Sequence, residues 1–463
     1  MNRLLLTGSL FLFSLTGFAQ KEEFLKEDSL FIRRLADEVL VHGKAYENLR
    51  VLTKTIGARL SGSPQYYQAE GWGQAALQSA GAEQVWLQEC LVPHWVRGGR
   101  DSASRIISGR PTDPKEDMLH VLALGNSVGT PEEGITAPVV LIHSFSELEL
   151  RKKELKGKIV FYNYPFNPQF VETFRAYADA VRYRVMGASN AARYGALAVL
   201  VRSISASVDN NPHTGSLLYN DSFPKIPAAA LGLRDADKLA ALLEQGTPVG
   251  VYLRTGAHML PDTLAHNVIG EIRGSDHPEQ FITVGGHLDS WDPAEGAQDD
   301  GAGCVHSIEV LRALKAIGYK PRHTIRVVLF ANEENGLRGG TKYAEEAKRK
   351  KEKHLFALES DAGGFTPRSF SISLPPEKLV KMHPWIRLLQ PYGVYEFTKG
   401  GGGADIGPLG DLGAILSELA PDSQRYFDYH HSSSDVLENV NKRELELGAL
   451  NMAALIYLVD KYL

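Results

Sequence analysis

The sequence predicts an α/β fold with a mostly parallel or mixed sheet flanked by helices, and a second unit inserted into that fold. Three observations lead to this prediction. Strand-like runs alternate with helical patterns from about residue 256 to the end. A stretch rich in Pro, Asp and Gly at 109–117 marks a change of pattern. The 463-residue length also exceeds that of one typical domain.

The first part of the main domain is expected at 20–119. Apolar residues recur with helical spacing over 24–50, and a second helix is predicted at about 65–80. Gly81 follows it, in the position where glycine commonly ends a helix. The alternating run at 85–91 then predicts a strand.

Residues 120–255 are interpreted as the inserted domain, with mixed strands and helices. Strands are predicted at 139–142, 158–161, 197–201 and 249–253, and helices at about 187–194 and 235–243. No group of residues typical of a catalytic site is recognised inside this segment.

Residues 256–463 are expected to form the rest of the main domain and to carry its chemistry. Strands are predicted at 281–285, 324–331, 355–358 and 414–419, with a helix at 304–317 between the first two. Because such alternation favours a mostly parallel sheet, ligands are expected beyond the carboxyl ends of these strands.

The charge balance excludes two classes of partner. Fifty Lys and Arg residues stand against 55 Asp and Glu residues, for a formal net charge of −5. This lacks the basic footprint of nucleic-acid-binding proteins and the polybasic patch of membrane-surface proteins. We expect neither nucleic acid nor a membrane surface as a partner.

The first 19 residues predict a cleavable secretory signal. Arg3 precedes an apolar run at 4–18, and Gly17 and Ala19 are small residues suited to cleavage before Gln20. The run is short for a membrane span, although an uncleaved anchor is the alternative. We expect a secreted or periplasmic protein that has no membrane attachment after cleavage.

The chain has two cysteines, Cys90 and Cys304. A mature chain of this size does not need their single possible disulfide, so two buried free thiols are expected.

Potential metal ligands follow three of the predicted strands. The first strand leads into His287 and Asp289, the second into Glu333 and Glu334, and the third into Asp361. Asp299 and Asp300 precede the predicted helix at 304–317, and His430 and His431 lie near the chain end. Each group alone is equally typical of an ordinary structural element, such as a helix cap or a solvated turn. Their combination at strand ends predicts a metal site.

Imidazole and carboxylate are the ligands that zinc takes in catalytic sites. Two histidines and three carboxylates are too many for one tetrahedral zinc with an open position, but they fit two zinc ions that share a carboxylate. Such a pair can hold an activated water and a substrate oxygen together. A carboxylate left free of metal can then move protons.

At these residues the sequence resembles the co-catalytic zinc exopeptidases, a family that includes bacterial secreted aminopeptidases and carboxypeptidase Q. The similar blocks are 55–63, 285–290, 296–303, 332–336, 360–364 and 426–432. Residues 120–255 resemble the protease-associated domain that is inserted in the carboxypeptidase Q branch, and this resemblance implies a β-rich inserted domain. The resemblance implies a phosphorylase/hydrolase-like α/β/α sandwich with two Zn²⁺ per chain, and a possible homodimer.

The resemblance also implies a role for each candidate residue. His287 and Asp361 would bind one zinc, and Glu334 and His431 the other, with Asp299 bridging both. Glu333 would be the general base that acts on a metal-bridged hydroxide, and Asp289 would hydrogen-bond His287 and fix its tautomer. His431 is preferred to His430 because the family places its ligand four residues before an acid, here Asp435.

The function expected is zinc-dependent hydrolysis of dipeptides or short peptides near a free terminus. A broad aminopeptidase acting on longer peptides is the alternative within peptidases. A non-catalytic binding scaffold and a single-zinc acyl transferase are the alternatives from other classes.

Two glycine-containing motifs receive structural interpretations. Gly125–Gly129 matches the G-x-S-x-G nucleophile pattern, but a polar loop follows where that motif needs a helix. It is interpreted as a linker. Gly400–Gly403 is expected to line the peptide cleft and to present backbone N–H groups to a substrate carboxylate.

Overall fold

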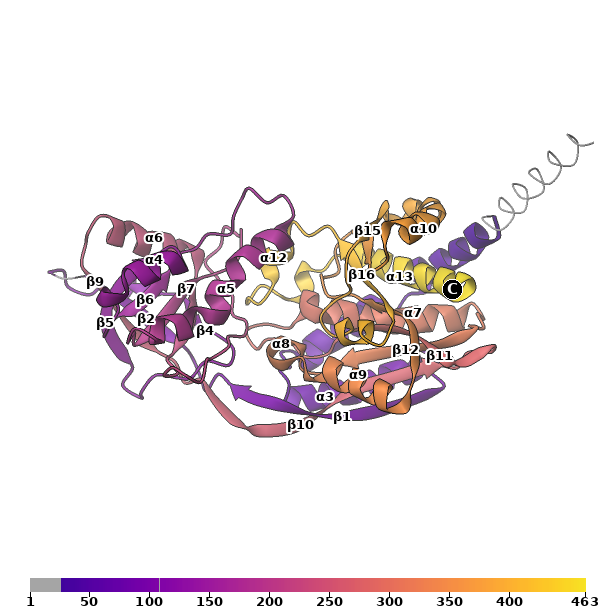
Figure 1. Cartoon of the computed structure of the whole chain (residues 1–463), viewed down its shortest axis with the longest axis horizontal. Coiled ribbons are helices and arrows are strands. Elements are labelled where there is room, and N and C mark those ends of the chain that lie inside the picture. Colours follow the sequence, from indigo (N-terminus) through magenta and orange to yellow (C-terminus); the bar gives the residue numbers. More distant parts are fainter. Residues whose placement is uncertain (1–25, 108) are drawn as a thin grey trace, which may run out of the picture.

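The computed structural model describes residues 26–107 and 109–463, so the predicted signal and its cleavage site lie outside the described residues. The described chain forms two α/β units that lie side by side along the long axis (Figure 1). Each unit is built on its own eight-stranded sheet.

The sheet of the larger unit has the strand order β1-β10-β12-β11-β13-β16-β14-β15. In that order the strands are Gln84–Val96, His258–Ile272, His323–Phe330, His277–His287, Lys353–Glu359, Ile415–Pro421, Pro367–Ile372 and Glu396–Lys399. The four central strands β12, β11, β13 and β16 run parallel, while β1 and β10 are antiparallel at one side. The predicted mixed α/β fold is confirmed.

Helices cover both faces of this sheet. One face packs against the helix at residues 26–42, α3 (Pro64–Ser79), α7 (Ala302–Ala316) and α13 (Lys442–Tyr462) in a shared apolar core. The other face packs against α9 (Arg338–Lys350) and the short α11 (Gly407–Gly410) in a second core. This three-layer arrangement buries the β-branched strands on both sides, as their continuous apolar sequence requires.

Local sequence sets where the main helices begin and end. Ser63 caps α3 by accepting a hydrogen bond from the amide of Tyr66, and Pro64 occupies its first turn. Gly81, with φ of 93°, follows its end. Asn441 caps α13 in the same way, by accepting from the amides of Arg443 and Glu444.

The sheet of the smaller unit has the order β3-β2-β9-β5-β6-β7-β8-β4. In that order the strands are Met118–Leu119, Ser102–Ile107, Val249–Arg254, Ile135–Ile142, Ile159–Tyr162, Ala198–Arg202, Ala228–Leu231 and Val121–Ala123. One face packs against α6 (Leu233–Glu244), and the other against α4 (Phe145–Leu150) and α5 (Thr173–Ala192). The strands β2 and β3 precede residue 120, so this sheet draws on more of the chain than the segment expected to be inserted.

The chain enters and leaves the smaller unit through a paired ribbon. The strands β1 and β10 pair along their length, and each runs directly into or out of the smaller unit (Figure 1). Next to this junction, Arg97 donates to both carboxylate oxygens of Asp292 at 2.7 and 2.5 Å and to Asp101 at 3.1 Å. These ion pairs tie the junction to the loop after β11.

Two expectations can be compared directly with the fold. Cys90 and Cys304 are buried and free, as expected. Across the described residues, no helix combines the length and apolar character needed to cross a membrane.

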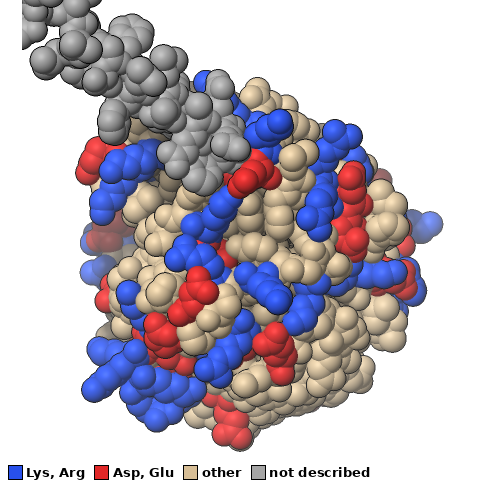
Figure 2. All heavy atoms as spheres, turned by 90° about the vertical axis from the view of Figure 1, so that its right-hand side faces the viewer, with Lys and Arg blue, Asp and Glu red and all other residues tan. Residues whose placement is uncertain are grey.

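Figure 2 shows the end of the molecule that lies on the right of Figure 1. Acidic and basic side chains are interspersed on this face, and other residues cover much of the rest (Figure 2).

Candidate metal centre

Three parallel strands end at one edge of the larger sheet, and a candidate ligand lies at each end. His287 is the last residue of β11 and pairs with Phe330, the last residue of β12. Glu333 and Glu334 follow β12 in the short helix α8 (Glu333–Gly336), and Asp361 follows β13. The register of the sheet therefore brings these side chains together, as is usual for sites at the carboxyl ends of parallel strands.

Asp299 lies between the two candidate histidines. Its Oδ1 is 3.2 Å from Nε2 of His287, and its Oδ2 is 3.1 Å from Nε2 of His431. On the first side, Oδ1 of Asp361 is 3.3 Å from Nε2 of His287. On the second side, Oε2 of Glu334 is 3.1 Å from Nε2 of His431. The five predicted ligands thus form two half-sites that share one carboxylate.

Backbone carbonyls orient both histidines. Nδ1 of His287 is 3.0 Å from the carbonyl oxygen of Asp289, and Nδ1 of His431 is 3.2 Å from that of Thr214. A proton on each Nδ1 satisfies these carbonyls and leaves each Nε2 free to accept a metal. Both rings therefore present their ligating nitrogens toward Asp299.

The Asp289 side chain makes a contact that the sequence did not predict. Its Oδ1 is 3.8 Å from Nδ1 of His287, so the backbone carbonyl of Asp289 provides the contact expected of its carboxylate. Oδ1 instead accepts a hydrogen bond from the amide of Glu333 at 3.1 Å. The Asp289 carboxylate thus positions the residue expected to be the general base.

Asp435 holds the loop that carries Asp299. Its carboxylate accepts hydrogen bonds from the amides of Ala297, Gln298 and Asp299 at 3.1, 2.6 and 3.1 Å. The sequence used Asp435 only as a marker for choosing His431. In the structure it connects the two segments that supply Asp299 and His431.

The site concentrates negative charge around two imidazoles. Burial acts to lower the pKa of His287, but the carboxylates of Asp361 and Asp299 outweigh it and hold that pKa well above its usual value. Burial and the nearby Asp299 raise the pKa of Glu334 to about 7. Burial, together with Asp361 and Glu334, raises the pKa of Glu333 well above its usual range. Carboxylates crowded in this way repel one another unless cations balance them.

The donor set fits metal ions better than it fits hydrogen bonding. Nε2 of His287 and Oδ2 of Asp299 are buried and make no well-directed hydrogen bond to the described residues, although each lies 3.1–3.3 Å from another candidate ligand. Such orphaned atoms are costly unless something else satisfies them. Imidazole nitrogens and carboxylates facing a common centre are ligands suited to zinc.

A cavity of about 400 Å³ opens onto this centre between the two units. The larger unit contributes Asp299, Glu333, Glu334, Asn335, Gly336, Leu337, Asp361, Tyr426, Phe427, His430 and His431; the smaller contributes Asn126, Phe174, Tyr177, Arg184, Val185, Ser216 and Leu218. Glu333 is partly exposed to it, with 21% of its side-chain surface accessible. A substrate can therefore reach the candidate base.

Contacts with the smaller unit extend to the metal-site segments. The side-chain amide of Asn335, the residue after Glu334, donates to Oδ1 of Asn126 at 3.2 Å, and Nδ2 of Asn126 donates to the backbone carbonyl of Asn335 at 3.4 Å. Nδ1 of His213 is 2.7 Å from the carbonyl oxygen of His430, whose ring stacks on His431 with centroids 3.5 Å apart. The smaller unit is therefore a wall of the candidate active site.

The sequence patterns did not predict that the smaller unit lines the cavity, and the expected position of one loop was wrong. Arg184 and Tyr177 of α5 line the cavity, but no local pattern distinguishes them from other helix residues. Gly400–Gly403, which was expected to line the cleft, is absent from the described lining. Gly403 instead lies where an added Cβ would be 2.3 Å from the Glu359 carboxylate.

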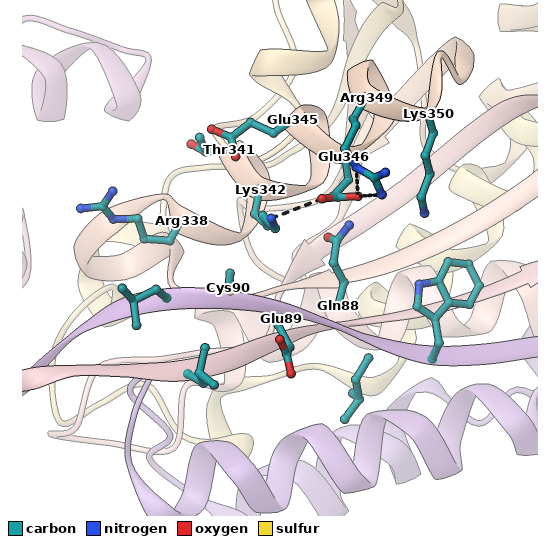
Figure 3. Close-up of a pocket in the computed structure, with 14 residues that line it drawn as sticks. Gln88, Glu89, Cys90, Arg338, Thr341, Lys342, Glu345, Glu346, Arg349 and Lys350 are labelled. Carbon is teal, nitrogen blue, oxygen red and sulfur yellow. Dashed lines mark hydrogen bonds and ion pairs between the residues drawn. The ribbon is translucent and has the colours of Figure 1, made fainter.

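A second, larger groove of about 650 Å³ lies between β1 and α9 (Figure 3). Its labelled side chains include Gln88, Glu89 and Arg338, and Glu346 pairs there with Lys342 and Arg349 at 3.3 and 2.6 Å. None of the five candidate ligands lines this groove. It offers neighbouring opposite charges and no histidine, so the smaller cavity is the better candidate for catalysis.

Known proteins resemble this chain in sequence and in fold. The sequence model described as Peptidase family M28 matches residues 267–456. Carboxypeptidase Q of Bos taurus and of Homo sapiens are each 37% identical to this chain over 423 residues, covering 90% of the chain and 86% of the relative.

Solved structures share the fold. A peptidase M28 precursor from Shewanella amazonensis superposes with a TM-score of 0.88 at 32% identity, covering 94% of this chain and 97% of the other. A zinc aminopeptidase from Bacillus subtilis superposes with a TM-score of 0.63 at 20% identity, covering 90% and 95%.

Proposed function

The chain belongs to peptidase family M28 and is a metallopeptidase, and from this premise we propose that it binds two zinc ions and hydrolyses dipeptides or short peptides that have free ends. The observation that carries the proposal is the position of Asp299, with one oxygen facing His287 and the other facing His431. This geometry fits two adjacent metal ions that share a carboxylate.

The proposed ligand sets follow the two half-sites. His287 and Asp361 would hold one ion, Glu334 and His431 the other, and Asp299 both. When bound, the two ions would supply Lewis-acid activation of water and polarise the scissile carbonyl. Asp435 keeps Asp299 in place, and the carbonyls of Asp289 and Thr214 keep the histidine rings oriented.

Glu333 is proposed as the general base. Its carboxylate lies in the cavity, with Oε2 4.0 Å from Nε2 of His287, and is not needed for either ligand set. It would accept a proton from the attacking water and deliver it to the leaving amine. Asp289 would set the position of Glu333 through the hydrogen bond from its amide.

Cleavage next to a free C-terminus is favoured over an aminopeptidase reaction. The relatives that match over 90% of the chain are named carboxypeptidases. A probable leucine aminopeptidase from Aspergillus oryzae is 30% identical over only 145 residues. We therefore propose a carboxypeptidase or dipeptidase activity.

Zinc analysis of the purified mature chain, combined with three substrates, tests this function. The substrates are an unmodified dipeptide, its N-acetylated form and its C-amidated form. About two zinc ions per chain are expected. A dipeptidase is expected to cleave the unmodified dipeptide alone, and a carboxypeptidase to cleave the N-acetylated form as well but not the C-amidated form. Cleavage that survives C-amidation but not N-acetylation would identify an aminopeptidase. Little zinc and no cleavage would remove the proposal and favour a binding scaffold.

Export, the inserted domain and assembly complete the proposal. Arg3, the apolar run at 4–18 and the small residues Gly17 and Ala19 support cleavage of a signal and secretion or periplasmic localisation. The smaller unit is proposed to be a protease-associated domain. A homodimer is proposed only by analogy with relatives. Sequencing of the mature N-terminus and light scattering of the purified protein would test export and assembly.

A further inference from the structure

The segment that carries His431 is held by a loop of the smaller unit. This segment follows α12 (Tyr426–Tyr429), which lies next to the smaller unit in Figure 1. The backbone amide of Thr214, in the loop at residues 211–215, donates to the carbonyl oxygen of His431 at 2.9 Å. In return, Nδ1 of His431 is 3.2 Å from the carbonyl oxygen of Thr214. One residue of the smaller unit thus fixes both the backbone and the ring of a proposed ligand.

Two side chains extend this contact on either side. Nδ1 of His213 lies 2.7 Å from the carbonyl oxygen of His430, and because a carbonyl can only accept, Nδ1 donates. Nδ2 of Asn211 donates to Oγ of Ser434 at 2.8 Å. His213 is 3% exposed, and its Nε2 has no hydrogen-bond partner within the described chain. The one hydrogen bond that its ring makes there is therefore directed at the segment that carries His431.

The loop at 211–215 is anchored to the sheet of the smaller unit. Oγ of Ser203, the residue after β7, accepts from the amide of His213 at 3.0 Å. Oγ1 of Thr214 donates to the carbonyl oxygen of Ala123, the last residue of β4, at 2.8 Å. The loop is therefore fixed to the smaller unit, and its position relative to His431 depends on how that unit sits against the larger one.

His431 needs support from outside its own segment. Its backbone has a φ of 60°, a left-handed conformation that is unfavourable for a residue with a Cβ. Such a conformation persists where the surrounding structure holds it in place. His287 is supported locally instead, because its Nδ1 contacts the carbonyl oxygen of Asp289, two residues along the same segment.

The two half-sites therefore differ in what holds them. Both ligands of one half-site are tied to the smaller unit, His431 directly and Glu334 through the residue that follows it, whose side chain bonds to Asn126. In the other half-site, no hydrogen bond between described residues joins His287 or Asp361 to the smaller unit. That half-site is formed by the larger unit alone.

We propose that the smaller unit completes the half-site of Glu334 and His431, so that zinc binds tightly there only while the loop at 211–215 is docked. This inference rests on the proposed function, and it assigns control of one of the two proposed zinc ions to the inserted unit. His213 and Thr214 are positioning residues in this arrangement. Because coupling between two binding events is reciprocal, zinc in this half-site also strengthens the docking of the loop.

The test measures the zinc affinity of each half-site separately in the full-length mature chain. His287→Ala leaves the half-site of Glu334 and His431 intact, and His431→Ala leaves the other. His213→Leu is added to each background, because it removes the one hydrogen bond that the ring makes to the segment. Zinc affinity is measured by competition with a chelator of known affinity.

Two further variants separate positioning from a general loss of stability. His213→Asn keeps an N–H donor close to the position of Nδ1, so it is the conservative replacement. Tyr162→Phe is the matched control, since the Tyr162 hydroxyl is buried in the smaller unit and donates to the carbonyl oxygen of Gly187 at 3.0 Å. It removes the same kind of hydrogen bond but one that does not reach the segment of His431.

In the His287→Ala background, His213→Leu is expected to weaken zinc binding about 10- to 100-fold, the scale on which groups that orient metal ligands contribute. In the His431→Ala background it should leave zinc affinity unchanged. His213→Asn should recover most of the loss, and Tyr162→Phe should change neither affinity. In the unmodified chain, zinc should also slow hydrogen exchange of the Thr214 amide, and His431→Ala should abolish this protection.

Equal weakening of zinc binding in the two backgrounds would show that His213→Leu loosens the fold in general, and it would overturn the proposal. An unchanged affinity in the His287→Ala background would overturn it as well, as would exchange at Thr214 that does not respond to zinc. Each of these results leaves the proposed function standing. If the unmodified chain binds no zinc, the proposed function itself fails, which is a distinct result.

Discussion

The carboxylate of Asp435 accepts a hydrogen bond from the amide of Asp299 at 3.1 Å, and the same carboxylate also holds the amides of Ala297 and Gln298. Asp435 therefore organises the loop that presents the shared carboxylate, although it lies outside the proposed ligand set. Its three acceptor contacts are buried, and their loss would leave three amides without a partner.

Asp435→Ala is expected to weaken zinc binding about 10- to 100-fold, because groups that orient metal ligands contribute on that scale. Zinc affinity is measured by competition with a chelator of known affinity. Asp422→Ala is a suitable control, since Asp422 has 38% of its side chain accessible and pairs with Arg368 away from the candidate ligands. An unchanged affinity in Asp435→Ala would mean that the loop keeps its shape without this carboxylate.

Glu333→Gln should retain about two zinc ions and lose turnover. Removing a general base typically lowers the rate about 10²- to 10⁴-fold, whereas the ligand carboxylates remain in place. Stopped or continuous assays of kcat, with metal analysis of the same sample, measure both effects. Glu345→Gln on the exposed side of α9 is the control. If Glu333→Gln lost zinc in proportion to activity, Glu333 would be a ligand instead.

Patterns in the sequence predicted the elements that carry the centre because those elements have strong local signals. The strands β11, β12 and β13 are short apolar runs, and their ligands follow directly at the strand ends. The signals were weaker elsewhere. The helix α5 spans Thr173–Ala192 but was expected only near 187–194, because Ala176 and Ala180 provide little apolar contrast on its buried side. The strand β1 continues past residue 91 across Pro93, where the register with β10 shifts.

Contacts between distant segments had no comparable signal. Arg184 meets His431 across 247 positions, and Thr214 meets it across 217. Neither pairing follows from periodicity or motif spacing, because both depend on how the smaller unit sits against the larger one. The Asp289 contacts also had no sequence signal, since its backbone carbonyl contacts His287 in place of its carboxylate, and the carboxylate accepts from the amide of Glu333.

Replacing Asp289 with Asn and with Ala should have different effects on kcat, because only Asp289→Ala removes the oxygen that accepts a hydrogen bond from the Glu333 amide. Asp289→Asn keeps an oxygen there, and a fall in kcat of only a few-fold is expected. Asp289→Ala leaves the buried amide unsatisfied, which costs about 1–3 kcal/mol of stability and should lower kcat further. Steady-state kinetics and chemical denaturation of both variants measure the difference. Equal kinetics for the two would rule out this positioning role.

Removing zinc should destabilise the fold, since ligand binding to the native state stabilises it in proportion to ligand saturation. At free zinc about 1,000 times the Kd, each site contributes about 4 kcal/mol. Chelation is therefore expected to lower the melting temperature, and added zinc to restore it. His287→Ala, which retains only the half-site of Glu334 and His431, should show a smaller shift on chelation. If chelation left the melting temperature unchanged, the prediction that bound zinc stabilises the fold would be contradicted.

The substitution Gly125→Ala tests whether the G-x-S-x-G segment has a structural role. A Cβ at Gly125 would lie 1.8 Å from the Trp291 ring, which also packs edge-on against His431 with centroids 5.9 Å apart. Gly125→Ala must therefore displace Trp291, and overpacking of this kind costs about 1–3 kcal/mol. Because Trp291 contacts a proposed ligand, zinc affinity and activity should fall together with stability. Denaturant unfolding, zinc competition and the dipeptide assay measure the three effects.

Two further variants separate this packing effect from the alternatives. Gly71→Ala lies on an exposed turn of α3, where an added Cβ meets nothing within 4 Å, and it should raise stability by about 0.5–1 kcal/mol. Ser127→Ala removes a buried hydroxyl that accepts from the amide of Ala228 at 2.9 Å. It should lower stability but keep kcat within a few-fold, because a nucleophilic role would need Ser127 in the cavity, and it is not among the described lining residues. If Ser127→Ala abolished turnover while zinc stayed bound, a serine nucleophile would be favoured over the metal centre. If Gly125→Ala left stability unchanged, the Trp291 ring would have moved aside at no cost in stability, contrary to this prediction.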